Sequence, residues 1–294
     1  MDSFFYKSKK DLERELLNGI IRNNTQEVKN ILEYSTENKI ILELNKKGRD
    51  GWYPLSRAIF EDNIEIVQLL IDYSIKNKIS LELNEKNSID GYPLLEAISN
   101  NNIEIVKLLI DYANKHKTSL ELKDKNKCGW YPILEATSHN NIELVKLLIN
   151  YAKVNNIILE LNWSDQNGYF PIFFSFNYNN IEMFKILLKY SMEKKLKLVI
   201  NENNIEDLIS KKYNFVNLKS ISDIKDEFIN LICLFKNKNI IEVICSGNSY
   251  LLKKFNEFNE NEKKKKQNND GKEKIENGNK NKKKGNNIFK HTNR

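Results

Sequence analysis

Histidine and cysteine side chains are the first candidates for catalysis or metal binding in this sequence, and both are scarce. The three histidines are far apart in the chain, and no nucleophile motif surrounds any of them. The three cysteines match neither a zinc-binding spacing nor an even set of disulfides. We therefore expect no enzymatic activity, no metal site and no cofactor. The residues concerned are His116, His139, His291, Cys128, Cys233 and Cys245.

Three glutamates, Glu82, Glu121 and Glu160, recur at an interval of 39 residues and would form an acidic ladder if they shared one face. Each of them stands between two leucines. That alternation is typical of an extended segment that buries the leucines and turns the carboxylate outward. We therefore favour a solvated row of carboxylates over a binding ladder.

The basic character of the chain belongs to its C-terminal end. Of the net charge of +7, residues 261–294 contribute twelve Lys and Arg against four Asp and Glu, so the rest is nearly neutral. A segment this poor in apolar residues cannot form a core and is expected to be a disordered tail. Lys263–Lys266 and Lys282–Lys284 could act as a nuclear import signal or as a weak nucleic-acid contact. The alternative is a solvated tail of biased composition.

A repeat of 39 residues organises the rest of the chain. Its proline stands at Pro54, Pro93, Pro132 and Pro171, and neither this series nor a Leu-Glu-Leu series slips by one residue. A period of this length indicates stacked supersecondary units, each unable to bury its apolar face alone. The Leu-Glu-Leu motif starts at Leu42, Leu81, Leu120 and Leu159, with a weaker copy at Leu198.

Each unit predicts two helices. A glycine three residues before the proline fits a tight turn, and proline suits the first position of a helix because its missing N–H is no loss there. An asparagine then offers an N-cap to a second helix, with a glutamate two residues inside it. These caps are Asn63, Asn102, Asn141 and Asn180, and Asn24 is the counterpart in a first unit without proline.

These motifs resemble the ankyrin repeat over about residues 8–200. The resemblance lies in the Gly-x-x-Pro-Leu opening, the small residue four positions after the proline, the Asn-x-Glu-x-Val segment and the Leu-Leu pair. This chain has aromatic residues where the family has a capping threonine, and it lacks the family's histidine. It also carries six extra residues after the second helix, which we expect to extend that helix by one to two turns. The aromatic residues are Tyr53, Tyr92, Tyr131 and Phe170.

The resemblance implies an all-α solenoid of ankyrin-like helix-turn-helix units. We expect an N-terminal capping unit over residues 1–45, four repeats over 46–200, a degenerate helical cap over 201–258, and the tail over 259–294. A separate effector module is the alternative for residues 201–258. No signal peptide and no membrane-spanning stretch is recognisable, so we expect a cytoplasmic protein, or a nuclear one through the tail.

The resemblance also implies a non-catalytic scaffold that binds a partner protein on the concave face of the stack. Residues that vary between copies on the first helices and turns are the predicted binding residues, because the core positions repeat. Two alternatives remain: an adaptor that recruits a second protein through its C-terminal segment, and a binder of anionic surfaces or nucleic acid through its tail. The predicted binding residues are Trp52, Arg57, Glu61, Glu96, Trp130, Glu135, His139, Tyr169, Phe174 and Tyr178.

Overall fold

The computed structural model describes residues 7–48, 51–210, 217, 219–245 and 249–265. The chain divides into two compact units, Met1–Leu198 and Val199–Arg294. Most of the expected basic tail, residues 266–294, lies outside the described residues.

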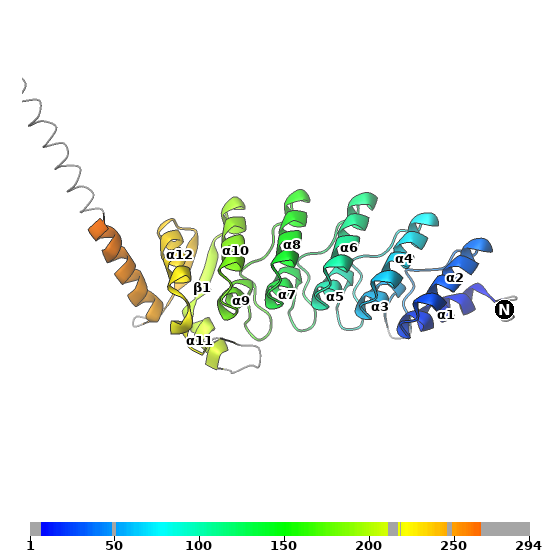
Figure 1. Cartoon of the computed structure of the whole chain (residues 1–294), viewed down its shortest axis with the longest axis horizontal. Coiled ribbons are helices and arrows are strands. Elements are labelled where there is room, and N and C mark those ends of the chain that lie inside the picture. Colours follow the sequence, from blue (N-terminus) through cyan, green and yellow to red (C-terminus); the bar gives the residue numbers. More distant parts are fainter. Residues whose placement is uncertain (1–6, 49–50, 211–216, 218, 246–248, 266–294) are drawn as a thin grey trace, which may run out of the picture. The chain divides into compact units, whose positions relative to one another are not determined.

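In the first unit the described residues form helix-turn-helix pairs that follow one another in a row (Figure 1). First helices pack on first helices of the neighbouring pairs, and second helices pack on second helices. The expected α-solenoid is therefore confirmed. The first helices are α1 (Lys9–Ile21), α3 (Pro54–Phe60), α5 (Pro93–Ser99), α7 (Pro132–Ser138) and α9 (Pro171–Asn177). The second helices are α2 (Thr25–Glu37), α4 (Ile64–Lys76), α6 (Ile103–His116), α8 (Ile142–Val154) and α10 (Ile181–Glu193).

The predicted helix starts are confirmed. Proline is the first residue of α3, α5, α7 and α9. The side-chain oxygen of Asn63 accepts a hydrogen bond from the backbone N–H of Ile66 at 2.9 Å, and the other asparagines cap in the same way. Each cap satisfies an N–H that the helix itself leaves without a partner.

The second helices extend past the tyrosine near their ends, as predicted. Helix α4 continues from Tyr73 to Lys76, and α6 and α8 extend similarly, which adds about one turn. The chain then enters a left-handed conformation at Lys78, with φ of 57°. No glycine is present at this position to favour that conformation. Lysine and asparagine take that conformation here, at Lys39, Lys78, Lys117, Asn156 and Lys195.

Tyrosine hydroxyls connect successive pairs. The hydroxyl of Tyr112 accepts from the N–H of Leu81 at 3.0 Å and donates to the carbonyl oxygen of Ile79 at 3.3 Å, so it holds the preceding extended segment. A second series reaches forward: the hydroxyl of Tyr131 donates to the carbonyl oxygen of Trp163 at 2.7 Å. The three tyrosines before the prolines thus make hydrogen bonds between units where the family has a capping threonine, whereas Phe170 has no hydroxyl to do so. The first kind of bond is also made by Tyr73 and Tyr190. The second kind is also made by Tyr53 and Tyr92.

The Leu-Glu-Leu segments alternate as predicted. Leu120 and Leu122 are buried, while the glutamates are exposed or half-buried. Some of these carboxylates pair with lysines, as Glu160 does with Lys123 at 3.2 Å. The row is therefore a solvated and partly paired surface.

The second unit mixes helices and strands. Strand β1 (Leu198–Asn201) pairs with β2 (Ile241–Ile244), and the unit also contains α11 (Glu202–Ser210), the 3-10 helix η1 (Ile221–Asp223), α12 (Asp226–Asn237) and a helix over residues 250–265. The predicted helical cap over residues 201–258 is thus not helical over its whole length. Residues 241–244 form a strand instead, and their β-branched side chains favour that state.

The expected domain boundaries remain predictions. The boundary expected at residue 258 falls inside the helix over residues 250–265, so this helix includes the first residues of the predicted tail.

Candidate functional site

Amide and carboxylate side chains close the turns that precede α5, α7 and α9. Oδ1 of Asn126 accepts hydrogen bonds from the N–H groups of Cys128 and Trp130, both at 3.0 Å. Asn87 and Asp165 make the corresponding bonds. These residues recur at 39-residue intervals, which was the signal available in the sequence, but we did not predict their role. They hold the backbone N–H of the residue that stands two positions before each proline.

We call the surface of α1, α3, α5, α7 and α9, together with Trp52, Gly91, Trp130 and Tyr169, the first-helix face. All ten predicted binding residues belong to these elements or to the residues that end the short helices. Four of them are buried: the exposed fractions are 7% for Trp52, 8% for Glu96, 0% for Tyr169 and 1% for Phe174. These four predicted binding residues are therefore not accessible as direct surface contacts. The half-buried residues are Arg57, Glu61, Trp130, Glu135, His139 and Tyr178.

The second pair of helices places a cation beside two aromatic rings. The guanidinium of Arg57 lies 5.9 Å from the ring of Trp52 and 5.4 Å from the ring of Phe60, and these two rings are 4.8 Å apart. Arg57 also pairs with Glu61 at 2.6 Å. Because Trp52 packs inside this cluster, its ring is covered although it stands on the first-helix face.

The third pair has no ring at the corresponding position. Gly91 stands there, and a Cβ atom on it would lie 1.8 Å from Oε1 of Glu96. The Glu96 carboxylate fills the space and accepts a hydrogen bond from Asn87 at 2.9 Å. A glutamate that the sequence predicted to be a surface contact is therefore buried, because the neighbouring glycine leaves room for it.

The fourth and fifth pairs form a continuous aromatic cluster. Trp130 lies 6.1 Å from the ring of Phe174, which in turn stacks on Tyr169 at 5.6 Å and on Tyr178 at 6.3 Å. The hydroxyl of Tyr178 donates to the carbonyl oxygen of Ser138 at 2.7 Å. This cluster joins neighbouring pairs, so its side chains serve the stack as well as the surface.

Glu135 and His139 give the middle of the face its polar groups. Oε1 of Glu135 accepts from the Ser99 hydroxyl at 3.0 Å and lies 3.5 Å from Nε2 of His139. Both side chains are half-buried. Nε2 of His139 is itself buried, so the two side chains are packed against one another at this point of the face.

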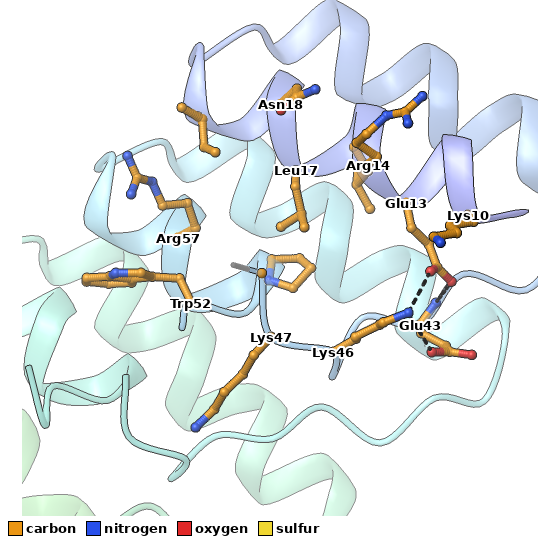
Figure 2. Close-up of a pocket in the computed structure, with 14 residues that line it drawn as sticks. Lys10, Glu13, Arg14, Leu17, Asn18, Glu43, Lys46, Lys47, Trp52 and Arg57 are labelled. Atoms are coloured by element: carbon orange, nitrogen blue, oxygen red, sulfur yellow. Dashed lines mark hydrogen bonds and ion pairs between the residues drawn. The ribbon is translucent and has the colours of Figure 1, made fainter. Parts of the chain in front are cut away.

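The N-terminal end of the face contains a groove of about 630 Å³ (Figure 2). Basic side chains surround an apolar floor, and Arg57 and Trp52 form one end of it. The groove is lined by Lys10, Glu13, Arg14, Leu16, Leu17, Asn18, Ile21, Glu43, Lys46, Lys47, Gly48, Trp52, Pro54 and Arg57.

The groups that could do chemistry are dispersed in the structure. In the part of the chain that the structure describes, no group of three or more His, Cys, Asp or Glu side chains is placed to hold a metal ion. The ring of His116 stacks on Tyr112 at 4.2 Å, and His291 lies outside the described residues. Burial raises the pKa of the Cys233 thiol to about 11, so it is a thiol at neutral pH.

Replacement of Glu96 by glutamine should change the pH dependence of stability. Burial raises the pKa of the Glu96 carboxyl above its ordinary value of 4.5, Glu135 acts in the same direction, and the hydrogen bond from Asn87 opposes both. Protonated Glu96 therefore contributes stability at low pH, and this contribution is lost as the pH rises through the folded-state pKa. Glu96→Gln keeps an acceptor oxygen without the charge.

Urea unfolding between about pH 4 and pH 7 measures this effect. We expect the free energy of unfolding of Glu96→Gln to increase relative to that of wild type as the pH rises, because wild type loses the contribution of protonated Glu96 and the variant does not. Glu104→Gln, on the exposed surface of α6, is the matched control and should follow the wild type. Parallel curves for wild type and Glu96→Gln would contradict the prediction.

Comparison with known proteins identifies one family. The family model described as ankyrin repeats (3 copies) matches residues 16–119 and again residues 94–198. A crystal structure described as that of EF0377, an ankyrin repeat protein, is 24% identical to this chain, with a TM-score of 0.48. The match covers 69% of this chain and 94% of that one. No curated protein matches the sequence. Among the described helices, none combines the length and apolarity that crossing a membrane requires.

Proposed function

The chain belongs to the ankyrin-repeat family, and on that premise we propose that its repeat stack is a non-catalytic module that binds a partner protein on the first-helix face. Ankyrin repeats are generally protein-interaction modules and typically non-catalytic scaffolds. The observation that supports this face is its composition. The face carries the Arg57–Trp52 cluster in the second pair, the polar Glu135 and His139 in the fourth, and the aromatic cluster around Phe174 in the fifth. The core positions of the pairs, by contrast, are nearly identical.

The ten residues of the proposed interface divide into two roles. The half-buried side chains of Arg57, Glu61, Trp130, Glu135, His139 and Tyr178 would contact the partner. Partly covered side chains of these types are suited to energetic hot spots, because they are already ordered and lose little entropy on binding. The buried Trp52, Glu96, Tyr169 and Phe174 would hold the contacting groups in place.

Affinity capture with the full chain tests this proposal. Glu61→Ala combined with His139→Ala removes two polar groups at corresponding helix ends, and neither group belongs to the aromatic cluster. We expect binding of the captured partner to weaken about tenfold or more, as for the loss of a hot spot. The matched control is Asp111→Ala combined with Asn150→Ala, which removes one acid and one polar group from exposed positions on α6 and α8.

Two outcomes would count against the proposal, and they differ in scope. Equal capture by the first pair and by wild type, with unchanged circular dichroism, would place the interface elsewhere. Failure of the wild-type chain to capture any protein specifically would argue against a protein-binding role. The alternative functions through the basic tail concern residues that lie mostly outside the described part of the chain.

A further inference from the structure

The groove at the N-terminal end of the stack occupies a position that aromatic rings fill in other pairs. In the second pair, the ring of Trp52 packs against Phe60 and lies near Arg57. In the fifth pair, Tyr169 packs against Phe173 and Phe174. The residues that contact each ring lie four, five or eight positions after it in the sequence. The same three positions can therefore be located in every repeat.

The first pair has the same site without the ring. The residue 39 positions before Trp52 is Glu13, and the positions four, five and eight residues later are Leu17, Asn18 and Ile21. All four line the groove, and Figure 2 shows Leu17 pointing into it. Ile21 is 43% exposed.

Leu17 is more accessible than the residues at the corresponding position of the other pairs. Leu17 is only half-buried, although its counterparts in all four later pairs are buried. Those counterparts are Ser56, Leu95, Leu134 and Phe173. The third pair also lacks the ring, but the carboxylate of Glu96 fills the space there. Among the described pairs, only the first has neither an aromatic ring nor a carboxylate covering this site. Apolar surface is therefore accessible there.

The residues that line the groove carry a net positive charge, which favours a negatively charged ligand. Five basic residues line it against two acidic ones, Glu13 and Glu43. Both carboxylates are within ion-pair distance of Lys9 and Lys46. When the neighbouring Lys9, Asp11 and Glu61 are counted as well, the groove and its rim contain six basic and four acidic residues. A cleft with an excess of one charge concentrates ligands of the opposite charge.

We propose that this groove docks an acidic peptide segment of a partner protein, and that an aromatic side chain of the segment takes the place of the ring missing from the first pair. The proposal deepens the proposed function, because it rests on the first-helix face being the protein-binding surface. The aromatic anchor contacts Leu17, Ile21 and the edge of the Trp52–Arg57 cluster. Acidic residues on either side of the anchor face Lys10, Arg14 and Lys47.

Fluorescence anisotropy with the full chain and short labelled peptides tests the proposal. The probe is a peptide with a central phenylalanine flanked by glutamates. The comparison peptides replace the phenylalanine by alanine or the glutamates by lysine, and a short single-stranded DNA tests for a general anion site. We expect the first peptide to bind at least about tenfold more tightly than the other three ligands, and its affinity to fall with salt.

Glu13→Trp is the decisive variant, because it supplies the missing ring. It removes a carboxylate and so makes the groove more basic, which would strengthen a purely electrostatic interaction. We expect the opposite, a loss of peptide affinity of about tenfold or more, because the ring occupies the anchor site. The matched control is Glu33→Trp, which adds the same ring to an exposed position on α2.

A charge reversal provides the second variant. Lys10→Glu combined with Arg14→Glu should also weaken binding about tenfold or more, whereas Lys29→Glu combined with Lys76→Glu, on the second helices, should not. Both double variants change exposed residues and alter the net charge equally, so neither is expected to disturb folding.

Three results would overturn the proposal: equal affinity for the phenylalanine and alanine peptides, unchanged affinity in Glu13→Trp, or equally tight binding of the DNA. Partner capture by the wild-type chain that survives in Glu13→Trp would reject the groove and leave the proposed function intact. Absence of any captured partner would instead reject the proposed function itself.

Discussion

Leu148→Ala should lower the free energy of unfolding by about 2–5 kcal/mol. Leu148 is fully buried in α8, and this helix packs between α6 and α10 as well as against α7. Loss of the side chain therefore removes apolar contacts at an interface that joins three pairs. Since the neighbouring helices are held in register by their own contacts, they cannot collapse fully into the cavity. Urea unfolding monitored by circular dichroism measures the loss.

Asn150→Ala is the control for this substitution. Asn150 is exposed on the same helix, so its replacement should change the free energy of unfolding by no more than about 0.5 kcal/mol. If Leu148→Ala proved as mild as Asn150→Ala, the core of the stack would not depend on contacts between neighbouring pairs.

Gly129→Ala should also destabilise the stack strongly. Gly129 has φ of +87°, and a Cβ atom there would lie 2.9 Å from both the Asp165 Cα and the backbone nitrogen of Gln166. The backbone conformation alone costs a residue with a side chain about 1–3 kcal/mol. The contact adds to this cost, because the atoms it meets belong to the backbone of the next turn, which cannot move aside as the end of a side chain could.

Gly51→Ala separates these two contributions. Gly51 has φ of +82°, but its Cβ atom would meet Ser88 at an ordinary distance of 3.4 Å. Both variants carry the conformational cost, and only Gly129→Ala carries the clash. Thermal melts should therefore show a larger loss for Gly129→Ala than for Gly51→Ala. Equal losses would mean that the turn of the fifth pair shifts freely away from the fourth.

The helical architecture follows from local features that a single sequence displays. A proline sets the φ angle of a first helical residue, and an asparagine such as Asn141 caps a helix within four residues of itself. These preferences act over short distances and recur every 39 residues, so the pairs, their order and their caps were all predictable. The one-turn extension of the second helices was predictable for the same reason.

The left-handed residues and the strand β2 show the limit of this approach. Lys78 lacks the glycine signal, yet it adopts a left-handed conformation that ends α4. The apolar run near Ile241 has a helical alternative, and pairing with β1 decides in favour of a strand. At β2, pairing with a distant strand outweighs a weak local preference, whereas at Lys78 the bonds that close the helix end are local: the N–H of Lys78 donates to Ile75 and that of Ile79 donates to Ser74.

The sequence by itself determined the repeat, the helix pairs and which residues lie on the first-helix face. Only the tertiary structure decided which of those residues are exposed: Trp52 is covered within its aromatic cluster, Glu96 is buried because Gly91 leaves space, and Leu17 is half-buried in the groove although its counterparts in later pairs are buried. The physical reason is that periodicity assigns a side chain to a face, whereas its exposure depends on the volume of the side chains packed against it. Those neighbours come from different turns and pairs, and the spacing of residues along the chain does not contain their volumes.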